Sequence, residues 1–170
     1  MRTNPFTVNG LLLAILIPLC AIRSFGQKPD LLLPVPAEQQ QISQMLSDIN
    51  QLRTRHGLPS LTLDARLCRA ARRHAEDMAQ YNYFGHRGRK RFLFASGPGT
   101  RATANGYQWT AIAENICAGN KNASAAFQNW ALSAEHYRNL MDPRYLDAGI
   151  GVARSPTKTY WVLLLALPWN

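Results

Sequence analysis

The sequence predicts an α+β fold in which helices pack on both sides of a small, mostly antiparallel sheet, an α-β-α sandwich. Hydrophobic residues make up 46% of the 170 residues and charged residues 17%, so a packed core is expected and wholesale disorder is excluded. Several segments repeat apolar residues at helical spacing. Near the C-terminus, two apolar runs flank Ser155–Thr159, which is typical of a β-hairpin.

Residues 1–26 have the pattern of a secretory signal peptide. Arg2 supplies a positive start, residues 10–22 are apolar apart from one proline, and Ser24 and Gly26 provide the small residues of a cleavage site. The apolar run is too short for a good membrane span. The alternative is a lipid attached to Cys20, although the residue before it is larger than usual for such a site. We therefore expect a secreted protein, periplasmic or extracellular.

The remaining chain is expected to divide into a linker, residues 27–41, and one folded domain, residues 42–170. The linker begins with a proline-rich stretch, which favours an extended chain. Apolar residues then recur at helical spacing over Ile42–Leu52, and Gly57 is expected to end that helix.

A second helix is expected to follow Asp64, a residue type that caps helices well. Its apolar face comprises Leu67, Ala71, His74, Ala75 and Met78. The stretch from Gly85 to Gly106 holds five glycines and a proline, so it is expected to be a long loop.

The C-terminal part alternates expected strands and helices. Ile112–Ala118 is a strand candidate, a helix opens at Ser124 or its neighbour, and Ser133 can cap a further short helix. Gly149–Ala153 and Tyr160–Leu167 are the two strands of the expected hairpin. Helices on both sides of the sheet would bury all of these apolar stripes.

A series of short motifs also occurs in a fixed order between residues 46 and 167. They are Asn50-Gln51-Leu52-Arg53, Gly57-Leu58-Pro59, Ala70-Ala71 with His74, Tyr83-Phe84-Gly85-His86, Glu114-Asn115-Ile116, Trp130 with Ser133 and His136, Gly149-Ile150-Gly151-Val152 and Tyr160-Trp161-Val162. The ordered set resembles the CAP superfamily (cysteine-rich secretory protein, antigen 5 and pathogenesis-related proteins), also called SCP domains, and above all its compact bacterial branch. The resemblance implies an α-β-α sandwich, as the apolar pattern does.

The resemblance also implies a polar cavity. Animal and plant members carry two histidines and two glutamates there; His86, Glu114 and His136 match three of these, and the fourth position falls on Ser133. Two imidazoles and a carboxylate are a ligand set that a divalent metal such as zinc accepts. The same groups could polarise water without a metal. Taken alone, each histidine is more often a hydrogen-bonded structural residue than a ligand.

Two functions from different classes fit this cavity. The first is a non-enzymatic binding module for a lipid, a peptide or a cell-envelope ligand. The second is a metal-assisted, peptidase-like hydrolase with His86 and His136 as ligands and Glu114 as ligand or base. The absence of the fourth carboxylate weakens the hydrolase hypothesis more than the binding hypothesis, because hydrolysis needs an acid and a base within hydrogen-bond reach. We therefore expect binding.

Other polar residues have structural explanations. His74 lies on an apolar helix face and is expected to be a core histidine. His56 precedes a helix-ending glycine, where a cation favours the helix dipole. Ser133, three residues before His136, fits a helix cap better than a nucleophile. Asn122 matches the glycosylation acceptor pattern, which we interpret as a chance match.

Cys68 and Cys117 are the cysteines left after a signal peptide is removed. An oxidising compartment favours a disulfide between them. The alternative is two buried thiols that act as small hydrophobic groups, and the sequence does not fix their distance.

The chain is basic, with 19 Lys and Arg against 10 Asp and Glu and a net charge of +9, so anionic partners are favoured. Five of these cations fall within fifteen residues beside His86, interleaved with two phenylalanines: Arg87, Arg89, Lys90, Arg91 and Arg101. They could contact an anionic envelope polymer or a membrane surface, or form a solvated loop. Nucleic acid is disfavoured, since an exported protein rarely meets it.

Overall fold

The computed structural model of the chain describes residues 36–89 and 96–169. Within these residues it forms five helices and four strands. In chain order they are α1 (Pro36–Arg55), β1 (Thr62–Leu63), α2 (Ala65–Tyr81), α3 (Pro98–Ala104), β2 (Trp109–Ala118), α4 (Ala123–Leu132), α5 (Ala134–Met141), β3 (Asp147–Arg154) and β4 (Thr159–Pro168). None of the described helices is long and apolar enough to cross a membrane. The expected signal peptide, residues 1–26, lies outside the described residues.

The four strands form one mixed sheet in the order β1-β3-β4-β2. β3 pairs with β4 and β4 pairs with β2, both antiparallel, which includes the expected hairpin. β1 adds two residues parallel to β3. Two residues carry no periodic pattern, so this strand could not be predicted from the sequence. β2 forms one edge of the sheet, and the candidate site lies there.

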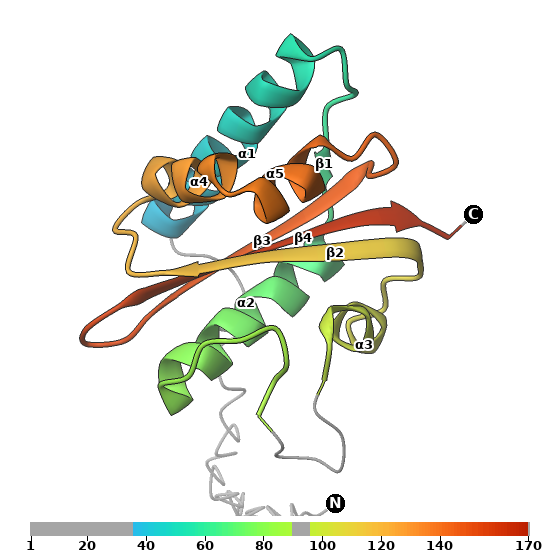
Figure 1. Ribbon diagram of the computed structural model, residues 1–170. Coiled ribbons are helices and arrows are strands. Elements are labelled where there is room, and N and C mark those ends of the chain that lie inside the picture. The colour runs from blue at the N-terminus through green and yellow to red at the C-terminus, as the bar shows by residue number, and fades with distance from the viewer. Residues whose placement is uncertain (1–35, 90–95, 170) are drawn as a thin grey trace, which may run out of the picture. The chain divides into compact units, whose positions relative to one another are not determined.

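The sheet separates two layers of helices, with α1, α4 and α5 on one face and α2 and α3 on the other (Figure 1). Each face has its own cluster of buried residues. The central strand β4 serves both, because Leu163 and Leu165 point into one cluster and Val162 and Leu164 into the other. The predicted α-β-α sandwich is therefore confirmed.

The helix α2 packs unusually close to the sheet. Asp64 caps it as expected, because its carboxylate accepts hydrogen bonds from the backbone N–H groups of Arg66 and Leu67 at 2.8 and 3.2 Å. A Cβ atom on Gly149 would lie 2.2 Å from the backbone of Leu67, and one on Gly151 equally close to the backbone of Arg72. Only glycine permits this approach.

Two expected boundaries differ from the structure. α1 begins at Pro36, so residues 36–41 of the expected linker are helical. Proline suits the first position of a helix because its missing N–H has no partner there anyway. α3 lies inside the stretch 85–106 that was expected to be a loop, and it also starts with a proline, Pro98. The surrounding glycines favour a loop, so the sequence does not predict this short helix.

The expected disulfide is wrong in this structure, where Cys68 and Cys117 are both free. Cys117, on β2, belongs to the core cluster on the side of α1 and α4. Cys68 lies on α2, across the sheet. Burial raises the pKa of both thiols, to about 12 for Cys117. Cys117 is therefore a buried thiol and Cys68 a partly buried one, close to the alternative interpretation.

Candidate functional site

Two consecutive residues of β2 organise the site. Side chains alternate between the faces of a strand, so Glu114 points toward α2 and α3 while Asn115 points toward α5. Both residues are buried. The Glu114-Asn115 pair therefore connects the two helical layers at the edge of the sheet.

Glu114 holds a histidine and an arginine. One carboxylate oxygen accepts a hydrogen bond from His86 Nδ1 at 2.9 Å, and the other forms an ion pair with Arg101. Arg101 also donates to the backbone carbonyls of His86 and Ser96, at 3.0 and 2.6 Å. The nearest other imidazole is His74, whose Nε2 lies 4.0 Å from Glu114 Oε1. The carboxylate is thus neutralised and both of its oxygens are engaged.

The bond to Glu114 fixes the tautomer of the neutral His86 ring. A carboxylate can only accept, so His86 Nδ1 carries the proton, and Nε2 of the neutral ring is an acceptor. No described residue donates to that nitrogen. The side chain of His86 is 53% exposed, so Nε2 is available to a ligand.

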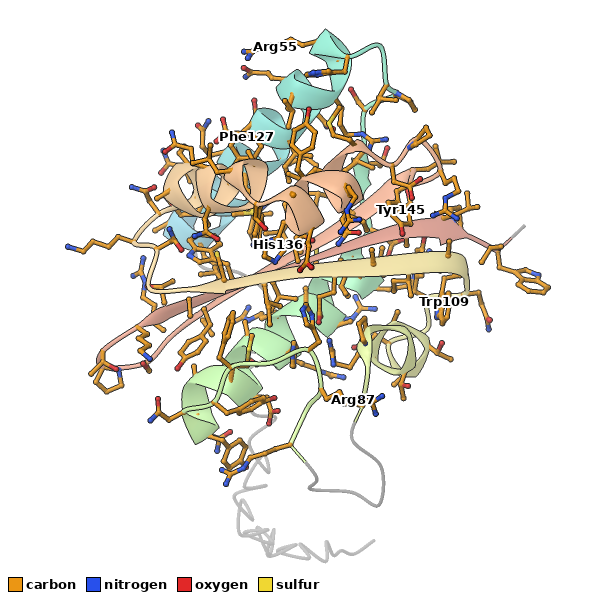
Figure 2. The ribbon with its side chains drawn as sticks, in the orientation of Figure 1. Arg55, Arg87, Trp109, Phe127, His136 and Tyr145 are labelled. Atoms are coloured by element: carbon orange, nitrogen blue, oxygen red, sulfur yellow. The ribbon has the colours of Figure 1, made fainter. Side chains whose placement is uncertain are left out.

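Asn115 positions the second histidine on the other face. Its amide donates to the backbone carbonyl of His136 at 3.0 Å, and its own carbonyl accepts from Asn139 at 2.8 Å. These bonds fix the first turn of α5 against β2, where Figure 2 shows His136. His136 Nδ1 is buried and has no partner among the described residues. Burial and the neighbouring His86 lower the pKa of His136, which favours the neutral ring.

His86 and His136 line one cleft of about 370 Å³, within the size range of small-molecule sites. The other lining residues are Phe84, Gly85, Ile116, Cys117, Ala118 and Asn129. The cleft therefore follows the edge of β2. Phe84 is 57% exposed and gives the cleft an apolar flank.

Two of the four expected cavity residues meet in this cleft, and two do not line it. Glu114 lies behind His86 and acts through it. Ser133 lies at the junction of α4 and α5, and it makes no side-chain capping bond although it occupies the N-cap position of α5. Ser133 is therefore a junction residue, and Asn129 and Phe84 contribute to the cleft instead.

The expected three-ligand metal set is not assembled. Among the described residues, no group of three or more His, Cys, Asp or Glu side chains could hold a metal ion. Arg101 occupies the carboxylate oxygen that would otherwise be free to ligate. What the cleft offers is two imidazoles, with Glu114 as the partner that orients one of them.

The remaining histidines agree with their structural explanations. His74 is buried, and its Nε2–H donates to the carbonyl of Gly85 at 2.9 Å. Burial and the nearby Arg101 lower the pKa of His74 to about 4. His56 is exposed, and its Nδ1–H donates to the carbonyl of Leu52 at the end of α1.

The expected basic surface is only partly described. Arg87 and Arg89 are exposed, and the guanidinium of Arg89 lies 5.4 Å from the ring centre of Tyr81. Lys90 and Arg91 lie outside the described residues. Arg101 is 8% exposed and pairs with Glu114, so it is a buried structural cation and was wrongly grouped with the loop.

The order of motifs along the chain matches a known protein family. The sequence profile of the CAP (cysteine-rich secretory protein) family matches residues 46–165. The chain belongs to this family. The CAP domain is 29% identical over 106 residues to the uncharacterized protein YkwD of Bacillus subtilis (strain 168), an alignment that covers 62% of this chain. It spans only 40% of that relative.

Solved structures show the same fold. An extracellular protein containing an SCP domain from Bacillus anthracis strain Ames is 27% identical, with a TM-score of 0.67, over 79% of this chain and 44% of that one. The crystal structure of NaASP2 with Zn²⁺ has a TM-score of 0.52 at 16% identity, over 81% of this chain and 82% of that one. The second likeness concerns the fold alone.

Proposed function

We propose that this CAP domain is an extracellular binding module whose cleft between His86 and His136 holds a small amphipathic ligand. The observation that carries the proposal is the hydrogen bond from His86 Nδ1 to Glu114, which leaves Nε2 as an acceptor at the cleft. The N-terminal signal pattern and the extracellular B. anthracis relative support the location.

The polar half of the ligand follows from the imidazoles. An acceptor at His86 Nε2 pairs with a hydroxyl group, which can donate, and not with a carboxylate, which cannot. The apolar half follows from the rim, where Phe84 is exposed and Leu132, which is 88% exposed, lies one helical turn beyond Asn129 on α4. An alcohol with an aliphatic tail therefore suits the cleft of the metal-free protein.

A divalent metal such as zinc suits the two imidazoles as well. Zinc binds neutral imidazole nitrogens, and the pattern carboxylate–histidine–metal is how proteins often orient such ligands. His86 and His136 would hold the ion, and Glu114 would fix the ring of His86. When bound, zinc supplies a Lewis-acidic position that accepts an anionic head group. The crystal structure of NaASP2 with Zn²⁺, a protein of the same fold, supports this choice of metal.

The alternative function is a metal-assisted hydrolase, and the His86–Glu114 pair is the observation in its favour. The two carboxylate oxygens, however, are held by His86 and Arg101. No Asp or Glu stands among the described residues that line the cleft. A general base of the carboxylate type would have to leave the Arg101 ion pair, so binding is the better-supported function.

The proposal is tested by titrating 1-decanol and decanoate in a calorimeter, with and without zinc. The metal-free protein should prefer decanol, and zinc should reverse the preference. Phe84→Ser should weaken both ligands, whereas Leu146→Ser, a matched change at an exposed leucine outside the cleft, should not. Equal binding by Phe84→Ser and the parent would refute the site. Zinc-dependent hydrolysis of casein that is lost in Glu114→Gln would favour the hydrolase.

A further inference from the structure

A second cavity, of about 310 Å³, lies between α2 and α3 and is independent of the proposed binding cleft. Its lining residues are Ala70, Arg73, His74, Asp77, Gly88, Arg89, Ser96, Thr100, Arg101, Ala104 and Asn105. It shares no lining residue with the cleft. Glu114 separates the two spaces, because it holds His86 of the cleft and Arg101 of this cavity.

Two side chains of this cavity have buried polar atoms without a partner among the described residues, His74 Nδ1 and Arg101 Nε. Buried polar atoms without a partner are uncommon, and a bound group or water is one explanation for them. His74 donates its Nε2–H to the Gly85 carbonyl, so its Nδ1 is an acceptor. Arg101 Nε–H is a donor. A single group that serves both atoms must accept and donate, as a hydroxyl does.

The mouth of the cavity is positively charged. Arg73 and Arg89 are exposed there, and neither forms an ion pair with a carboxylate side chain in the described part of the chain. Arg73 donates to the neutral amide oxygen of Asn105 at 3.0 Å. The one acidic lining residue, Asp77, already accepts from the hydroxyl of Tyr83 and from the backbone N–H of Arg89. An anion at the mouth would therefore meet two available guanidinium groups.

We propose that this cavity binds the phosphate ester of a small polyol. A ligand hydroxyl reaches Arg101 Nε and His74 Nδ1, where it accepts from the first and donates to the second. The phosphate lies at the mouth between Arg73 and Arg89, whose planar guanidinium groups suit phosphate oxygens. Because the phosphate is near solvent, its share of the affinity is screened by salt, whereas the buried hydroxyl contributes at any ionic strength.

The test is calorimetric titration of the full chain with glycerol 3-phosphate, inorganic phosphate and glycerol, at low and high ionic strength. Glycerol 3-phosphate should bind most tightly, and salt should weaken it. Arg73→Gln should weaken it by roughly tenfold, the loss expected for one charge-assisted hydrogen bond. Arg69→Gln removes the same charge from α2 outside the cavity and should have no effect.

Each alternative result has a defined meaning. Glycerol 3-phosphate binding no tighter than inorganic phosphate would overturn the hydroxyl position. No binding of any probe would also overturn the proposal. His136→Ala should lose the ligands of the cleft and keep glycerol 3-phosphate, so failure of one site is distinguishable from failure of the other.

Discussion

Glu114 Oε1 accepts a hydrogen bond from His86 Nδ1 at 2.9 Å while the other oxygen of the same carboxylate is paired with Arg101. This arrangement gives Glu114 a positioning role. It neutralises a buried arginine and fixes which nitrogen of the neutral His86 ring faces the cleft. The site thus combines the exposed imidazole of His86 and the half-buried imidazole of His136 with the buried Glu114–Arg101 ion pair, which supports His86.

Replacing Glu114 with glutamine should destabilise the protein by about 3 kcal/mol or more, because Arg101 would be left as an unpaired buried charge. The free energy of unfolding from urea titration measures this loss. Glu135→Gln removes an exposed carboxylate near the same cleft and should change stability little. Equal stability of the two variants would mean that Arg101 is not held by Glu114.

Arg53 should be among the most sensitive positions of the fold. It is fully buried, and its guanidinium donates to the carbonyls of Pro59, Leu140, Asp142 and Tyr145. Arg53→Met should cost on the order of 3 kcal/mol or more, because four carbonyl acceptors lose their donor. Arg55→Met, at an exposed position of the same helix, is the control. Similar urea midpoints for both variants would contradict this role.

Gly151→Ala should also destabilise the fold strongly, since its Cβ would lie 2.2 Å from the Arg72 backbone nitrogen. Overpacking of this kind costs about 1–3 kcal/mol and sometimes more. Gly97→Ala is the matched control, because a Cβ there meets no atom within 4 Å. Thermal midpoints of the two variants test the close contact between α2 and β3. A tolerated alanine at position 151 would show that the helix packs less closely.

The lowered pKa of His74 predicts that the folded protein loses stability in acid. Its pKa is about 4 in the folded protein and 6.5 ordinarily, so below pH 6.5 the unfolded chain binds a proton that the folded chain refuses. Stability should therefore fall by about 3 kcal/mol as pH drops from 6.5 to 4. His74→Gln removes this titration and keeps an amide donor for Gly85. Parallel stability–pH curves for parent and variant would disprove the shift.

The sequence predicted the large elements well because their apolar periodicity reflects burial directly. Three local features are found in the structure as predicted: the cap at Asp64, the buried face of α2 and the hairpin around Ser155–Thr159. Short elements without a period, such as β1 and α3, were missed. The disulfide was misjudged because sequence spacing does not reveal that the sheet lies between Cys68 and Cys117.

The candidate site was predicted in part. The likeness to a family brought His86 and His136 together, and the cleft contains both. Arg101 falls within a basic run of the sequence, and none of its neighbours in the chain indicates that it turns inward to Glu114. The role of Asn115 could have been inferred, since a polar residue next to Glu114 on one strand must face the opposite layer.

The account rests on His86 and His136 forming one site, and calorimetric titration with zinc tests this most directly. The parent should bind zinc, and binding should weaken as pH falls and the imidazoles protonate. His86→Ala and His136→Ala should each lose most of the zinc affinity at an unchanged thermal midpoint. His56→Ala, which removes an exposed histidine at the far end of α1, should bind zinc as the parent does. Parental zinc affinity in both cleft variants would contradict a shared site.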